Sequence, residues 1–270
     1  MSTSVRESAN PIGVFDSGVG GLSVLREIRT ELPNEALLYV ADSAHIPYGD
    51  KSSAFIEERA IAISEFLIAQ DAKAIVVACN TATSAAIAAL RARYSIPIVG
   101  MEPAVKPAVN ATRSGIVGVL ATNGTLAGDK FAELAARFGA SAEILIQPCP
   151  GLVEQIEAGE LSSERSRSLV AEYVSPLVKR GADVIVLGCT HYPFLMPLIK
   201  EIAGDTVTIV DPSPAVAREL RRRLENAGLL RSDAPHKKNL FWTSGSAEKN
   251  APLISRLWGE SVAVHMLPSS

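Results

Sequence analysis

The feature that most constrains the fold is an alternation of short apolar runs with amphipathic stretches along nearly all of the 270 residues. The runs are almost uniformly apolar, as expected for strands that are buried on both faces of a parallel sheet. The segments between them carry apolar residues at helical spacing, as at Leu22, Leu25 and Ile28. Strand–helix alternation predicts an α/β fold in which mostly parallel sheets are flanked by helices. The ten predicted strands are residues 12–15, 36–40, 74–78, 96–99, 115–121, 143–146, 184–188, 207–210, 239–242 and 262–266.

Composition and charge exclude several classes of protein. Hydrophobic residues make up 47% of the chain and charged residues 20%, which excludes a disordered chain. The formal net charge of −3 argues against a nucleic-acid partner, because neutralising phosphates requires an excess of Lys and Arg. No apolar run reaches the roughly 18 residues of a membrane span, and the N-terminus has no apolar signal segment. We therefore expect a cytoplasmic protein without a membrane partner, with its three cysteines reduced.

Two internal similarities predict that the chain contains two related α/β halves. Residues 72–79 align with residues 182–189 at an offset of 110, and both segments end in a cysteine that a polar pair follows. Residues 13–17 resemble residues 118–122 at an offset of 105. Ligands of α/β folds gather at the carboxyl ends of strands. The matched cysteines, Cys79 and Cys189, are therefore the first candidates for a functional site.

A cysteine between a buried strand and a helix lies near the N-terminal amides of that helix, which stabilise a thiolate. The sequence predicts such a helix over Thr81–Tyr94, capped by Asn80 or Thr81. Two thiols on opposite sides of one carbon atom form a two-base site, which inverts a stereocentre. Two alternatives remain. Both cysteines can be buried structural residues, or Cys79, Cys189 and His191 can bind zinc, although no close ligand pair is present.

The end of the first predicted strand carries a glycine-rich turn directly after Asp16. Backbone N–H groups of such turns bind anions, whereas Asp16 itself suits an ammonium group. A dinucleotide site remains an alternative, because Asp42 ends the second strand, where a ribose-binding acid would lie. Against it, position 23 is Ser, so the full G-x-G-x-x-G motif is not met. The polar loop after Asp42 is either part of a site or a plain surface loop.

Four motifs, taken together and in order, resemble the glutamate racemases of the aspartate/glutamate racemase superfamily. Each motif alone is only suggestive, but the four in this order are highly specific. The resemblance runs from about residue 12 to residue 258, and residues 1–10, outside it, are expected to be disordered. The motifs are Phe-Asp-Ser-Gly-Val-Gly-Gly at 15–21, Ala-Asp-Ser-Ala at 41–44 with Pro-Tyr-Gly at 47–49, Ala-Cys-Asn-Thr-Ala-Thr-Ser at 78–84, and Gly-Cys-Thr-His-Tyr-Pro at 188–193, with further similarity at 121–125 and 241–245.

The resemblance implies a cofactor-independent enzyme that interconverts L- and D-glutamate, the D-form feeding peptidoglycan synthesis. By motif, Cys79 and Cys189 are the two catalytic bases, and no metal is implied. Glu157, after a Cys-Pro element, matches the position of a family glutamate better than Glu154, and Cys149 is interpreted as structural. Auxiliary acid–base roles are implied for Asp16, His191 and Glu157. Substrate contacts are implied for Asp16, Ser17, Tyr48, Gly49, Asn80, Thr81, Thr122, Thr190 and His191.

The resemblance also implies two similar α/β domains with the site between them. The first takes residues 1–101 and 213–270, and the second takes residues 102–212. A homodimer is the implied assembly. The competing interpretations are an aspartate- or hydantoin-type racemase of the same superfamily and a non-catalytic binding or regulatory relative. His191 argues against the aspartate type, because aspartate racemases usually carry glutamate at that position.

Overall fold

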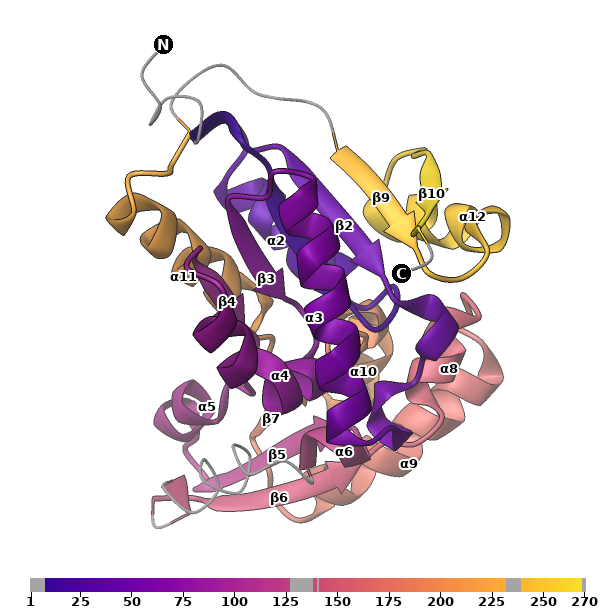
Figure 1. Ribbon diagram of the computed structural model, residues 1–270. Helices are drawn as coiled ribbons and strands as arrows, with labels where there is room; N and C mark the ends of the chain where they lie inside the picture. Colours follow the sequence, from indigo (N-terminus) through magenta and orange to yellow (C-terminus); the bar gives the residue numbers. More distant parts are fainter. Residues whose placement is uncertain (1–7, 127–137, 140, 232–238, 269–270) are drawn as a thin grey trace. The chain divides into compact units, whose positions relative to one another are not determined.

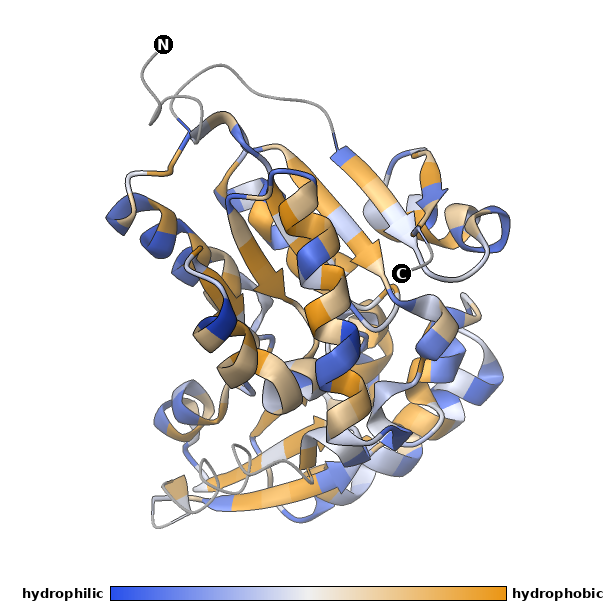
Figure 2. Cartoon of the chain, in the orientation of Figure 1, coloured by the Kyte–Doolittle hydropathy of each residue, from blue (hydrophilic) through white to orange (hydrophobic). Residues whose placement is uncertain are grey.

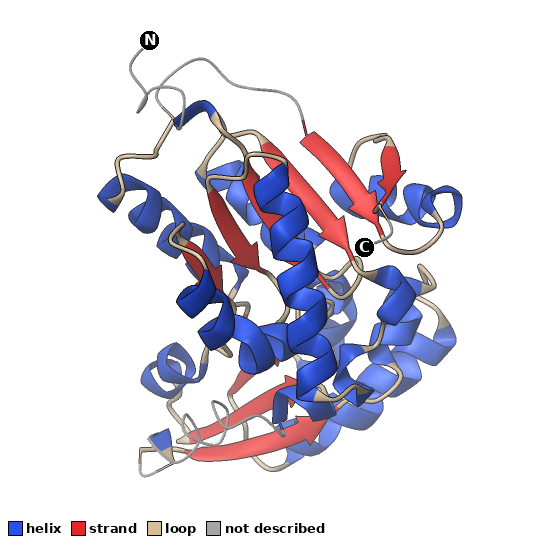
Figure 3. Ribbon diagram, viewed as in Figure 1, coloured by secondary structure: helices blue, strands red, loops and turns tan. Residues whose placement is uncertain are grey.

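The computed structural model describes residues 8–126, 138–139, 141–231 and 239–268 (Figure 1). The chain divides into two compact units, residues 1–101 with 213–270 and residues 102–212. Every pairing between the described strands is parallel, and the strands form two sheets. Helices flank both sheets (Figure 3). The predicted α/β class with mostly parallel sheets is confirmed.

Within the described residues, the first unit holds a six-stranded sheet in the order β10-β9-β2-β1-β3-β4. Helices α3 and α4 pack against each other, and α2 packs against α11. The strands are β1 (Ile12–Asp16), β2 (Leu37–Ala41), β3 (Ala74–Val77), β4 (Ile98–Gly100), β9 (Asn239–Thr243) and β10 (Val264–Met266). The helices are α2 (Leu22–Glu31), α3 (Ser53–Ala69), α4 (Asn80–Arg93), α11 (Ser213–Asn226) and α12 (Ala247–Trp258), with 3₁₀ helices η1 (Ser43–His45) and η2 (Tyr48–Asp50).

Both faces of this sheet are covered, which explains why its central strands β1, β2 and β3 are buried at every position. On one face, Phe15 and Val77 join Leu67 of α3 in a buried core cluster. Helix α2 contributes Leu22 and Ile28, which are fully buried, and it packs with α11 as a separate helical layer. Figure 2 shows the strands mostly in the hydrophobic colour, whereas the helices carry hydrophilic turns as well. Burial of this apolar surface stabilises the unit by about 25 cal/mol for each Å² removed from water.

The second unit holds, within its described residues, a four-stranded sheet in the order β6-β5-β7-β8. All ten strands predicted from the sequence are present, each within two residues of its predicted bounds. The strands of this unit are β5 (Ile116–Ala121), β6 (Glu143–Pro148), β7 (Val184–Gly188) and β8 (Thr208–Val210). The helices are α5 (Val105–Ala111), α6 (Asn123–Leu126), α8 (Leu152–Glu157), α9 (Glu164–Lys179), η3 (Tyr192–Leu195) and α10 (Met196–Ala203).

The strand pairing confirms the internal repeat. Strand β1 lies between β2 and β3, as β5 lies between β6 and β7. In register, Phe15 pairs with Val77 and Leu120 pairs with Leu187. These two pairs are related by the same offsets, 105 and 110, that relate the repeated sequence segments. The two halves therefore share strand order and register around the strands that precede the two cysteines.

One packing detail is repeated as well. A Cβ atom at Gly13 would lie 3.0 Å from Cδ1 of Leu67, and a Cβ atom at Gly118 would lie 2.8 Å from Cδ1 of Leu177. Each leucine belongs to the helix before the cysteine-bearing strand, α3 in one unit and α9 in the other. In both units the central strand carries glycine because a leucine of this helix occupies the space of its side chain.

Residues 1–10 were predicted to be disordered, and 1–7 lie outside the described residues. For residues 8–10 the prediction is wrong, because the structure describes them. The carbonyl oxygen of Ser8 accepts a hydrogen bond of 2.6 Å from Lys73 Nζ.

The carboxyl ends of the strands gather the polar residues that the sequence singles out. The strand-end residues are Asp16, Asp42 and Cys79 in the first unit and Thr122, Cys149 and Cys189 in the second.

Candidate active site

The thiol of Cys79 caps the helix that follows β3. Cys79 is 5% exposed, and its Sγ accepts a hydrogen bond of 3.4 Å from the backbone N–H of Ala82. The prediction that Asn80 or Thr81 caps this helix is wrong, because both residues lie within its first turn. The sulfur faces the positive end of the α4 dipole, an arrangement that favours a thiolate. The hydroxyl of Ser17 lies 3.9 Å from the same sulfur.

The next two residues bring polar groups to the same helix terminus. Asn80 is 4% exposed, and neither Oδ1 nor Nδ2 of its side chain has a hydrogen-bond partner in the described part of the chain. A buried polar group without a partner costs about 1–3 kcal/mol, so a polar ligand would relieve this cost. Thr81 beside it is buried too. Cys79 and Asn80 therefore place a base and an unused amide at one helix terminus.

The glycine-rich turn after β1 binds a carboxylate of the protein itself. Asp16 is fully buried, and its Oδ2 accepts a hydrogen bond of 2.8 Å from the backbone N–H of Gly21. The hydroxyl of Tyr39 donates to the carbonyl oxygen of Gly18 at 2.6 Å and braces the turn from β2. Asp16 thus holds its carboxyl group in a fixed place at the carboxyl end of β1, and a carboxyl group suits a cationic ligand group such as an ammonium.

The loop after β2 is organised around Asp42 rather than left as a plain surface loop. The hydroxyl of Tyr48 donates to Asp42 Oδ2 at 2.6 Å, and burial followed by the Asp42 charge raises the pKa of Tyr48. Tyr48 is buried, whereas Gly49 is partly exposed. The hydroxyl proton of Tyr48 is therefore used within the protein, in its hydrogen bond to Asp42. Arg59 also binds Asp42, a partner that sequence analysis missed.

In the second unit, three side chains form a line that begins at Cys189. The Sγ of Cys189 lies 3.7 Å from Nδ1 of His191, and Nε2 of His191 lies 2.7 Å from Oε1 of Glu157. His191 is 2% exposed and the Glu157 side chain 15%. Thr190, between the cysteine and the histidine, is buried. A thiol, an imidazole and a carboxylate in contact can pass or share a proton.

The structure distinguishes the two candidate glutamates on α8. Glu157 contacts His191, whereas Glu154, one turn earlier, has an exposed side chain.

Thr122 accepts a hydrogen bond of 3.3 Å from the N–H of Thr125 and so caps α6 after β5. Thr122 holds the strand-end position in the second unit that Ser17 holds in the first.

Cys149 differs from the other two cysteines. Its thiol donates to the carbonyl oxygen of Gln147 at 3.2 Å, and its backbone N–H donates to the carbonyl oxygen of Ala121. Burial raises the pKa of Cys149 well above its ordinary range, although the neighbouring Tyr192 side chain opposes the shift. A thiol that stays protonated in a buried setting packs as a small apolar side chain, in keeping with the structural interpretation.

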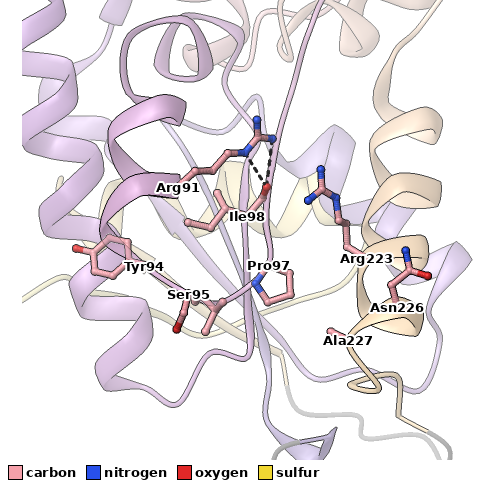
Figure 4. Close-up of a pocket in the computed structure, with 9 residues that line it drawn as sticks. Arg91, Tyr94, Ser95, Pro97, Ile98, Arg223, Asn226 and Ala227 are labelled. Atoms are coloured by element: carbon pink, nitrogen blue, oxygen red, sulfur yellow. Dashed lines mark hydrogen bonds between the residues drawn. The ribbon is translucent and has the colours of Figure 1, made fainter.

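A pocket of about 520 Å³ lies elsewhere in the first unit, where α4 ends and β4 begins (Figure 4). Arg91 lines it and donates two hydrogen bonds of 3.3 Å to the carbonyl oxygen of Ile98, and Arg223 of α11 lines it as well. It therefore lies away from the strand ends that carry Asp16 and Cys79.

Among the described residues, no group of three His, Cys, Asp or Glu side chains could hold a metal ion. No helix in the described ranges is long and apolar enough to cross a membrane.

Comparison with known proteins identifies the family of the chain. Residues 12–220 match the Asp/Glu/Hydantoin racemase family. The glutamate racemase of Ectopseudomonas mendocina is 56% identical over 263 residues, covering 97% of this chain and 100% of the relative. Among solved structures, glutamate racemase isoform RacE1 from Bacillus anthracis has a TM-score of 0.87 and 34% identity, covering 96% of this chain and 97% of that one.

Escherichia coli glutamate racemase, solved in complex with L-glutamate and the activator UDP-MurNAc-ala, has a TM-score of 0.84 and 35% identity. The match covers 95% of this chain and 97% of that one. The chain therefore belongs to the Asp/Glu/Hydantoin racemase family, and it is an enzyme, an amino-acid racemase. Within that family it belongs to the glutamate racemases.

Proposed function

We propose that this racemase interconverts L- and D-glutamate by two-base proton transfer between Cys79 and Cys189. The observation that carries the proposal is the matched placement of the two thiols, each within two residues of the end of the corresponding strand of its unit, β3 or β7. Cys79 removes the α-proton of D-glutamate and Cys189 that of L-glutamate. In each direction the other cysteine, as a thiol, delivers a proton to the opposite face of the α-carbon.

The two thiols have different local support. The N–H of Ala82 stabilises a thiolate at Cys79, whereas His191, held by Glu157, exchanges a proton with Cys189. An α-proton is far less acidic than a thiol, so preorganised donors must stabilise the carbanionic transition state. Backbone amides at the strand ends supply such donors.

The substrate contacts follow the same strand ends. Asp16 binds the ammonium group, and the unpartnered amide of Asn80 binds a polar group of the substrate. We take the two units as the two domains of the enzyme. The remaining contacts are assigned to Ser17, Tyr48, Gly49, Thr81, Thr122, Thr190 and His191.

We also propose a biological role, an assembly and a location for the enzyme. D-glutamate supplies peptidoglycan synthesis, and the working form is a homodimer. Two catalytic thiols must stay reduced, which supports a cytoplasmic location. No cofactor takes part, so the purified protein should racemise glutamate in EDTA. Activity that is lost on chelation and restored by zinc would contradict this part of the proposal.

The deciding experiment follows racemisation of L- and D-glutamate in D₂O by NMR, with aspartate as the competing substrate. A two-base enzyme delivers solvent deuterium to the product enantiomer, while the unreacted substrate keeps its α-proton at early times. Deuterium that enters both enantiomers equally from the start would indicate a single base. Turnover of aspartate in preference to glutamate would favour the aspartate type.

Single variants test the assignment of the thiols. Cys79→Ser and Cys189→Ser keep the shape but remove the thiolate, so racemisation should collapse in both directions. On a glutamate analogue that eliminates a β-leaving group, the remaining thiolate needs no second base. The two variants should then process opposite enantiomers of the analogue. Loss of the same enantiomer in both variants would contradict the assignment.

A further inference from the structure

A buried carboxylate in the first unit holds together the segments around the proposed substrate contacts. Asp42, directly after β2, is fully buried and receives two hydrogen bonds from Arg59 of α3. Arg59 Nε donates to Oδ2 at 3.0 Å and Nη2 donates to Oδ1 at 2.8 Å, a bidentate pair. The Tyr48 hydroxyl donates to Oδ2 at 2.6 Å, and His45 Nδ1 lies 3.0 Å from Oδ1.

A residue near the far end of the chain lies beside the same loop. Ser244, directly after β9, is close enough to Asp42 to lower the pKa of this carboxyl. Its hydroxyl also accepts a hydrogen bond of 3.1 Å from the N–H of Ala44, and its own N–H donates to the carbonyl oxygen of Ala41 at 3.0 Å. The loop after β2 is thus tied to α3 through Asp42 and to the segment after β9 through Ser244.

The charge of Asp42 is well compensated. Burial alone would raise its pKa, but hydrogen bonds from Arg59 and Tyr48, together with the nearby Ser244, outweigh burial and lower it. The Arg59 side chain is 16% exposed and is the cation paired with this carboxylate. Removing one partner of such a buried pair leaves an uncompensated charge, so the neighbouring groups must rearrange. The groups that would move first are those that bind the same oxygens, above all Tyr48.

Tyr48 connects this carboxylate to the catalytic helix terminus. Its ring belongs to the same buried cluster as Cys79 and Ala82, and η2 packs against α4. The place of the Tyr48–Gly49 segment is therefore determined on one side by packing and on the other by its hydroxyl on Asp42.

We propose that Arg59 is a positioning residue, which acts through Asp42 to hold the Tyr48–Gly49 segment in place for the substrate. The inference rests on the proposed function, which gives Tyr48 and Gly49 a substrate contact. Arg59 itself does not touch the substrate. A displaced binding segment weakens substrate and transition state alike, so the loss should be expressed mainly in KM rather than in kcat.

The test measures kcat and KM for glutamate with Arg59→Ala, Arg59→Lys and Tyr48→Phe. We expect Arg59→Ala to raise KM about 10- to 100-fold, with a much smaller change in kcat. Arg59→Lys keeps the charge but loses the planar fork, so its KM should fall between those of Arg59→Ala and the unaltered enzyme. Tyr48→Phe should raise KM as well, and the double variant should be no worse than Arg59→Ala alone, because both changes break one chain of contacts.

The matched control is Arg93→Ala. Arg93 of α4 pairs with Glu65 of α3 at 2.8 Å, but both side chains are about half exposed, and KM should stay within twofold. A folded Arg59→Ala variant with unchanged KM, or fully additive effects of Arg59→Ala and Tyr48→Phe, would overturn the proposal. If Arg59→Ala does not fold, Tyr48→Phe decides by the same criterion. Failure of the unaltered enzyme to racemise glutamate would instead refute the proposed function.

Discussion

The line of contacts from Cys189 to Glu157 makes a quantitative prediction for Glu157→Gln. Glu157 Oε1 lies 2.7 Å from His191 Nε2, and the imidazole is almost fully buried. A carboxylate at this place accepts the Nε2–H, which leaves the lone pair of Nδ1 directed toward the Cys189 thiol 3.7 Å away. A glutamine keeps the shape of the side chain but removes the charge that supports a protonated His191.

The magnitude follows from the kind of hydrogen bond. Hydrogen bonds to charged groups contribute about 1.5–3 kcal/mol, and about 1.36 kcal/mol corresponds to a factor of ten. Because the contact supports proton transfer at Cys189, we expect kcat/KM to fall about 10- to 100-fold. The two enantiomers of glutamate have equal free energies in water. The fall in kcat/KM must therefore be the same in both directions, whichever cysteine Glu157 serves.

The assay measures racemisation of each enantiomer by circular dichroism, together with the midpoint of thermal unfolding. Glu154→Gln is the matched control, because Glu154 lies on the same helix with an exposed side chain, and its kcat/KM should stay within twofold. The reasoning is refuted if Glu157→Gln keeps near-normal kcat/KM, or if both variants lose activity equally. A fall that comes only with a large loss of thermal stability would also count against a role in proton transfer.

Two other changes test neighbouring features. Cys149→Ala should keep most racemase activity, because its thiol is buried, donates to the carbonyl oxygen of Gln147 and has a raised pKa. A folded variant that loses several orders of magnitude in kcat/KM would show that the thiol takes part in catalysis. Asp183→Asn should lower the unfolding temperature at pH 7, because hydrogen bonds from Thr112, Arg113 and Ser114 outweigh burial and hold the pKa of Asp183 at about 2. A carboxyl with a lowered pKa stabilises the fold above its ordinary pKa of 3.8 and loses this contribution as the pH falls toward 2. Thermal melts should therefore show the difference between the two proteins narrowing over that range, and a constant difference would contradict the assigned hydrogen bonds.

Some features of this protein were determined by the sequence alone. The central strands β1, β2, β3 and β7 are buried at every position and therefore nearly all apolar. With the less buried outer strands, all ten runs could be predicted within two residues of their bounds. The internal repeat could be recognised in the sequence because equivalent strand positions, such as Phe15 and Leu120, are packed in the same way in both units. Cys79 and Cys189 were found because a strand end is a local feature.

Only the tertiary structure decided which polar groups meet. Arg59 reaches Asp42 from 17 residues away, and Glu157 reaches His191 from 34 residues away. Many carboxylates and arginines in the sequence could have formed such pairs. The family motif favoured Glu157 over Glu154, but only the structure shows that Glu157 contacts His191. The capping thiol of Cys79 was missed because cysteine is not among the residues that usually cap helices. Burial selects apolar residues at regular positions along the chain, so it can be recognised in the sequence. A hydrogen bond between distant residues depends instead on where their side chains lie once the strands and helices have packed.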